Sequence, residues 1–274
     1  HTFTEFAQRM KNDEMITLAK FLAISGIILP MLPHKNLIPD INLTPYSIWL
    51  ATVVVSGISY LSYLLKRYVF HESGTLVSGI IGGLYSSTAT ISVLARKSRK
   101  ASEQEATDYV AAMLLAVSMM FLRFMILILI FSREIFLSIY PYLLTMAVVA
   151  AIVAWFIHSR QKRPEDQPAE TEEDDSSNPL EFKVALIFAV LFVIFTFLTH
   201  YTLVYAGTGG LNLLSFVSGF SDITPFILNL LQNTGSVAAL IITACSMQAI
   251  ISNIMVNMFY ALFFAGKGSK LRPW

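Results

Sequence analysis

The segment that most constrains this chain runs from Leu76 to Arg99, because it is apolar enough to enter a bilayer yet interrupted at its centre. It reads LVSGIIGGLYSSTATISVLARKSR, in which Gly82 and Gly83 are followed by a run of hydroxyl residues. Backbone exposed to lipid must satisfy its own hydrogen bonds, so a broken helix at membrane depth survives only inside protein or beside water. The pattern therefore predicts a functional broken helix rather than a plain spanning one.

The remainder of the chain supports a membrane setting. Hydrophobic residues make up 55% of the sequence and charged residues 14%, and the mean hydropathy is +0.63. This is more apolar than a soluble domain of 274 residues needs to fill its core. We expect an all-α integral membrane protein with about six transmembrane helices, each near the roughly 20 residues that cross a bilayer core. The predicted helices cover residues 15–32, 46–65, 109–131, 135–158, 184–205 and 235–264.

A second, fainter broken segment runs from Leu211 to Gln232 and reads LNLLSFVSGFSDITPFILNLLQ. When the central glycines of the two segments are aligned, four positions are identical and Asp222 lies over Ser86. Each segment follows a long apolar helix and is followed by a helix that opens with two alanines. These features predict an internal duplication.

The distribution of basic residues indicates whether the broken segments cross the membrane. Cytoplasmic loops carry an excess of Lys and Arg. Sixteen such residues lie in loops and tails, and they divide 14 to 2 between the two sides if both segments turn back, but evenly if both cross. A leg of about ten helical residues rises about 15 Å, half of a bilayer core. We therefore expect two re-entrant helical hairpins whose tips meet at the midplane, with both termini cytoplasmic.

This topology predicts an inverted internal repeat. The unit of helix, hairpin and helix occurs as repeat 1 at residues 46–131 and, in the opposite orientation, as repeat 2 at residues 184–264. An acidic stretch at residues 159–178, expected to be a flexible linker, separates a first half, 1–158, from a second half, 179–274. Inverted repeats with broken helices at their interface are typical of transporters that bind near the midplane.

The two predicted tips carry groups that could hold an ion or a small polar solute. Half-helix ends present unpaired N–H and C=O groups, hydroxyls can donate or accept, and glycines let backbone approach a solute. The candidate binding residues lie at the first tip, at the second tip and on the helices behind them: Gly82, Gly83, Ser86, Ser87 and Thr88; Asp222 and Thr224; Arg123 and Asn253.

Each candidate also has a purely structural interpretation. The hydroxyls of the first tip could cap a kinked helix, and Asp222 fits an N-cap with Pro225 in the following turn. Arg123 and Asp222 fall in the same half of the membrane, so they could form a gate, part of an ion site or a structural buried salt bridge. Asn253 fits interhelical hydrogen bonding equally well.

The sequence lacks the residue patterns that metal sites, cofactor sites and catalytic sites require. The histidines are scattered without metal-ligand spacing, so we expect no metal site. The sequence has no phosphate-binding loop, no nucleophile elbow and no paired catalytic carboxylates, so we expect neither an enzyme nor a cofactor. Cys245 is the single cysteine, which excludes an intramolecular disulfide.

Four stretches resemble the C-terminal membrane domain of unknown function of MgtC/SapB-type bacterial proteins: GGLYSSTATISVLARKSR at 82–99, FLR at 121–123, NPLEFKVALIF at 178–188 and SGFSDIT at 218–224. The resemblance implies a bacterial inner-membrane protein, a preceding MgtC-like domain and a link to magnesium homeostasis. Thr224 stands where the family pattern has a second Asp, and Asn257 where it has a Lys. These departures weaken the case for a paired-carboxylate cation site.

The sequence therefore predicts a multi-pass transporter or channel of the bacterial inner (cytoplasmic) membrane, for an ion or small polar solute. The alternative is a non-transporting membrane protein that regulates or scaffolds another membrane protein, with the hairpins only packing the bundle. The expected partners are the lipid bilayer, the ion or solute and further copies of the chain in a homo-oligomer, and nothing indicates nucleic acid.

Overall fold

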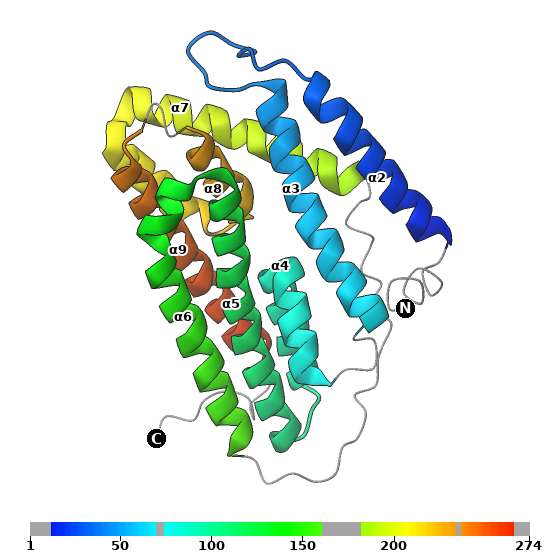
Figure 1. The fold of residues 1–274 in the computed structure, drawn as a ribbon. Coiled ribbons are helices and arrows are strands. Elements are labelled where there is room, and N and C mark those ends of the chain that lie inside the picture. The colour runs from blue at the N-terminus through cyan, green and yellow to red at the C-terminus, as the bar shows by residue number, and fades with distance from the viewer. Residues whose placement is uncertain (1–11, 70–73, 161–181, 234–236, 266–274) are drawn as a thin grey trace.

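The protein folds as a bundle of helices, seen in a computed structural model that describes residues 12–69, 74–160, 182–233 and 237–265 (Figure 1). Most of the predicted linker, residues 159–178, lies outside the described residues. The helices are α2 (Asn12–Met31), α3 (Pro45–Leu64) with its π-helical extension η1 (Leu65–Val69), α4 (Thr75–Ser98), α5 (Glu103–Phe131), α6 (Arg133–Ser159), α7 (Phe182–Ser218), α8 (Ile223–Gln232) and α9 (Ala239–Phe264).

The expected fold class is confirmed, because six helices within the described ranges are long and apolar enough to cross a membrane. Five of the six predicted spans are among them, as α3, α5, α6, α7 and α9, and the sixth helix, α4, contains the first predicted broken segment. The predicted first span forms α2, whose apolar part, Leu18–Met31, is shorter than those six. It packs against α3 at the edge of the bundle (Figure 1).

Several helix starts follow from local capping. Thr44 and Ser47 form a capping box at the start of α3, with Pro45 in the first turn. Ser102 and Glu105 form the same arrangement at α5. Such caps satisfy backbone N–H groups that a helix start leaves unpaired. These boundaries are therefore encoded by neighbouring residues.

Both predicted broken segments contain a break in the backbone. Ser86 has φ −158° and ψ 106° within α4, and in the second segment α7 ends at Ser218 before α8 begins at Ile223. A further break, at Gly207 with φ +59° and ψ −151° within α7, lies before the second predicted segment and was not expected. A Cβ placed on Gly82 would lie 2.5 Å from the Oγ1 of Thr90. Eight residues of continuous helix would separate these positions by about 12 Å along the axis. The two arms of α4 therefore fold back on each other, which confirms the predicted hairpin.

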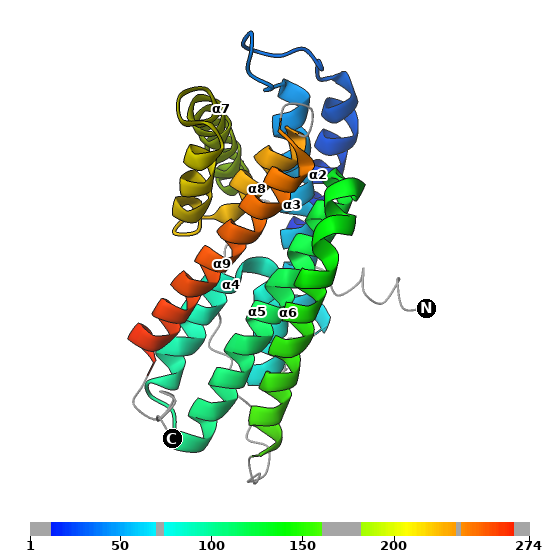
Figure 2. The same ribbon diagram turned by 90° about the vertical axis from the view of Figure 1, so that its left-hand side faces the viewer.

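The two hairpins enter from opposite ends of the bundle. α4 rises from the end where α5 begins and turns back about halfway along, whereas the turn between α7 and α8 is reached from the other end (Figures 1 and 2). The long first part of α7 runs across that end, transverse to α5 and α6 (Figure 1). The apolar run at 184–205 thus forms the predicted helix in an orientation that differs from that of its expected counterpart, α3.

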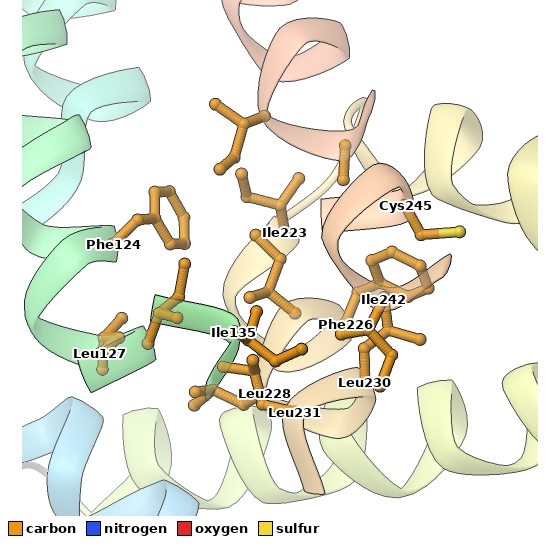
Figure 3. Packing of buried hydrophobic residues seen from close by; sticks show 14 of the residues in the cluster. Phe124, Leu127, Ile135, Ile223, Phe226, Leu228, Leu230, Leu231, Ile242 and Cys245 are labelled. Carbon is orange, nitrogen blue, oxygen red and sulfur yellow. The ribbon is translucent and has the colours of Figure 1, made fainter. Parts of the chain in front are cut away.

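α8 is the centre of the main hydrophobic core. All of its residues from Ile223 to Leu231 are buried. Figure 3 shows its side chains among those of α5, α6 and α9, including Phe124, Ile135 and Ile242. In contrast, α6 exposes large apolar residues along its outer face, such as Trp155 at 69% and Leu137 at 57%. An apolar exterior around a packed interior is consistent with contact with a lipid bilayer.

Candidate functional site

The first tip is formed where the arms of α4 meet. Ser86 breaks the helix, and its Oγ accepts a hydrogen bond from the backbone N–H of Ala89 at 3.4 Å, so it caps the returning arm. Ser87 is buried at 8% exposure, and Thr88 is half-buried. The structural interpretation of these hydroxyls, as caps of a kinked helix, is therefore met at Ser86.

The two glycines of the first tip lie in close packing contacts. Gly82 faces Thr90 across the hairpin, as described above. A Cβ on Gly83 would lie 2.5 Å from the Cα and 2.6 Å from the backbone oxygen of Ala116 on α5. Gly83 therefore lets the incoming arm lie directly against the α5 backbone, so packing alone explains why these two positions are glycines.

The sequence reasoning missed a packing motif on this arm. Gly79 and Gly83 are four residues apart, and they contact Ala112 and Ala116, which share the same spacing on α5. Small residues at this spacing let membrane helices approach closely and pack by van der Waals contact. The signal was present in the sequence, but only the structure shows that the two pairs meet.

At the second tip, Asp222 is the N-cap of α8. Its Oδ1 accepts a hydrogen bond from the backbone N–H of Thr224 at 3.0 Å, and Pro225 lies in the first turn. Thr224 is buried, but Asp222 itself is exposed. Alignment of the two broken segments placed Asp222 over Ser86, and in the structure both residues cap the returning arm of their hairpin.

Asn253 on α9 forms a hydrogen bond with the second tip. Its Nδ2 donates to the backbone oxygen of Gly219 at 3.1 Å, and the neighbouring Ser252 Oγ donates to that of Phe216 at 2.7 Å. These carbonyls stand at the end of the incoming arm, where a helix leaves acceptors unpaired. A third residue of the same face, Asn257, donates to Asn253 Oδ1 at 3.2 Å.

Arg123 makes the equivalent contact at the first tip. Its guanidinium donates to the backbone oxygen of Tyr85 at 2.7 Å, next to the break at Ser86, while its buried Nε lacks a hydrogen-bond partner within the described part of the chain. Asp222 acts on this guanidinium through its charge, but no direct ion pair between the two is found among the described residues. Arg123 and Asp222 therefore interact through their charges at a distance and do not form a direct salt bridge.

The two tips thus have the same arrangement of hydrogen bonds and caps. In each, the helix that follows the hairpin donates a side-chain hydrogen bond to a carbonyl of the incoming arm, and an oxygen-bearing side chain caps the outgoing arm. Both views place the tip of α4 and the turn before α8 near the middle of the bundle (Figures 1 and 2). The structure brings one cation, Arg123, and one carboxylate, Asp222, into this region. Of the residues described, no group of three or more His, Cys, Asp or Glu could hold a metal ion.

Comparisons with known proteins give a family without a stated activity. A family model described as a domain of unknown function (DUF4010) matches residues 53–265, which include both hairpins. An uncharacterized protein of Aquifex aeolicus (strain VF5) is 24% identical over 208 residues, covering 74% of this chain and 87% of that relative. No solved structure matches the chain.

Proposed function

Because the chain belongs to the DUF4010 family, whose description states no activity, we propose a function from the site itself: a membrane transporter or channel for an ion or small polar solute. The observation that carries this proposal is the exposed carboxylate of Asp222 at the second tip, within the electrostatic reach of Arg123. A charged carboxylate is costly when it faces lipid. The exposed position of the Asp222 carboxylate is therefore more consistent with a water-filled path than with surrounding hydrocarbon.

The two hairpins support the same proposal. Their entry from opposite ends and their matching caps and donors fit an inverted repeat of the two hairpins and the helices that follow them, α5 and α9. In such folds, half-helix ends near the midplane bind the transported species. With the charge distribution of the loops, this arrangement supports a bacterial inner-membrane protein with cytoplasmic termini. The resemblance to MgtC/SapB-type proteins makes Mg²⁺ the first solute to test.

Flux through purified protein in liposomes tests the proposal. We expect the wild type to move at least one member of a panel containing Mg²⁺, Na⁺, K⁺, H⁺, Cl⁻ and phosphate. Asp222→Asn should lower that flux at least about tenfold, because it removes the charge. It should lower stability by no more than about 1 kcal/mol, because Asn caps helices as well as Asp does and only the charge interaction with Arg123 is lost. Empty liposomes and Glu134→Gln, which removes an exposed charge on α6, are the controls. Absence of flux for the whole panel would contradict transport.

Labelling with a membrane-impermeant thiol reagent tests the topology. In a Cys245→Ser background, single cysteines at the exposed positions Gly74, Lys100, Thr208 and Ala238 flank the two hairpins. We expect Gly74 and Lys100 to be labelled from one side only and Thr208 and Ala238 from the other. Labelling of Gly74 and Lys100 from opposite sides would mean that α4 crosses the membrane.

One observation favours a second candidate, a non-transporting protein that regulates or scaffolds a membrane partner. The polar groups of both tips are largely engaged within the chain, through Arg123 to Tyr85, Asn253 to Gly219 and the two caps. A site whose groups are satisfied internally can serve packing alone. If the protein has this second function, we expect no flux in liposomes. We also expect mild cross-linking in membranes to recover a stable complex with the partner.

A further inference from the structure

A separate cavity of about 310 Å³ lies at the end of the bundle where the loop between α2 and α3 meets α7. Its walls come from the turn at Asp40 and Asn42, the middle of α7 and Asn233 at the end of α8. This volume is at the lower end of the range of small-ligand pockets. The cavity takes in none of the residues assigned to the hairpin tips.

A buried hydroxyl in the wall lacks a partner. Thr199 is 2% exposed, and its Oγ1 makes no hydrogen bond to any described residue. Thr196, one turn earlier on the same wall, donates to the carbonyl of Phe192 at 2.9 Å and accepts from Asn229 at 2.6 Å. Buried polar groups are normally paired. The Oγ1 of Thr199 exposes less than 1 Å² of surface, so a ligand in the cavity does not reach it, and Thr199 serves as a control position beside the groups that do face the cavity.

The charge of the wall selects for a cation. Asp40 supplies a carboxylate, and the lining contains no Lys or Arg. His200 also lines the cavity, and when neutral it can accept a hydrogen bond through a ring nitrogen. Asn42 uses its Nδ2 to donate to the backbone oxygen of Gln232 at 3.0 Å, which leaves its amide oxygen as the acceptor. The cavity thus combines a carboxylate with neutral acceptors, matching the three donors of an ammonium group. Leu203 and Val204 add apolar surface for a hydrocarbon chain.

The backbone at Asp40 supports a binding role. Ile41 donates to the carbonyl of Ile38 at 3.4 Å, with Pro39 and Asp40 at the centre of the turn, and Asp40 has φ +66°. Glycine or asparagine is preferred at such a position. A carboxylate held there at a conformational cost is consistent with a use for its charge.

We propose that this cavity binds a primary ammonium group on a short hydrocarbon chain, supplied either by a free amine or by the headgroup of phosphatidylethanolamine. The ammonium would donate to Asp40 and Asn42. The loop that carries Asp40 is joined to α8 through the bond from Asn42 to Gln232, so a bound amine would contact both the loop and the end of the second hairpin. The site does not depend on whether the protein transports a solute.

Calorimetric titration of the full chain in phosphatidylcholine nanodiscs with butylammonium tests the proposal. We expect binding, with affinity lowered at least about tenfold by Asp40→Asn, which suits the turn but removes the charge. Thr199→Val should change the affinity by less than about twofold, because the hydroxyl that it removes is not exposed to the cavity. Glu134→Gln, which removes a charge from the start of α6, and the neutral ligand 1-butanol are controls.

Nanodiscs that contain phosphatidylethanolamine distinguish the two sources. If the lipid occupies the cavity, butylammonium will bind more weakly to the wild type in these discs; if only free amines enter, its affinity will be the same in both discs. Either result supports the site. Equal binding of butylammonium and 1-butanol, an unchanged affinity in Asp40→Asn, or no binding together with no effect of the lipid would overturn it.

Discussion

Replacing Gly83 with alanine is expected to lower the free energy of unfolding by about 3 kcal/mol, at the upper end of the range for overpacking. The added methyl would lie 2.5 Å from the Cα and 2.6 Å from the backbone oxygen of Ala116. Because these are backbone atoms of α5, no side-chain rotation can relieve the contact. Gly83→Leu should prevent the hairpin from docking altogether. The measurement is the fraction of monodisperse protein that survives heating in detergent.

Two further variants separate this mechanism from a general glycine effect. Gly26→Ala on α2 adds a methyl where no atom lies within 4 Å, so its stability should stay within about 1 kcal/mol of the wild type. Ala116→Gly should not rescue Gly83→Ala, since removing the Ala116 side chain leaves the clashing backbone in place. Wild-type stability of Gly83→Ala would show that α4 does not pack on α5 as described.

Arg123→Met is expected to lower the free energy of unfolding by about 2–3 kcal/mol, the range for losing a hydrogen bond to a charged group. The change leaves the carbonyl of Tyr85 without its donor at the break in α4, and it leaves Asp222 without a neighbouring cation. Arg123→Gln should recover much of the stability by donating an amide N–H, but not the charge. The measurement is again the fraction of monodisperse protein that survives heating in detergent. Arg133→Met, at an exposed position, is the control.

A double-mutant cycle tests the electrostatic part separately. If Asp222 stabilises Arg123 through its charge, the cost of Arg123→Met should be smaller in an Asp222→Asn background than in the wild type. A difference of about 0.5–1 kcal/mol is expected for two charges that interact without direct contact. Equal costs in the two backgrounds would show that Arg123 acts on Tyr85 alone.

The candidate site could be predicted in part. Asp222 was expected either to bind or to cap a helix, and the cap is confirmed because Asp followed by Pro225 is a local signal. Arg123 was expected to lie in the same half of the membrane as Asp222, with which it could form a gate, part of an ion site or a salt bridge. Its partner could not be predicted, since a backbone carbonyl such as that of Tyr85 leaves no mark in the sequence.

The places of the membrane helices, the breaks at Ser86 and between Ser218 and Ile223, and several helix starts were determined by the sequence alone, whereas the break at Gly207 was not expected. These features depend on apolar run length, on glycine and hydroxyl residues, and on capping bonds between residues three apart, all of which are local. Only the tertiary structure decided that Gly82 lies against Thr90, that Gly83 lies against Ala116 and that α7 crosses the end of the bundle. These contacts depend on which helix faces pack against each other across long sequence separations. Many helix faces in the chain have a similar composition, so the sequence does not single out the pairs that meet.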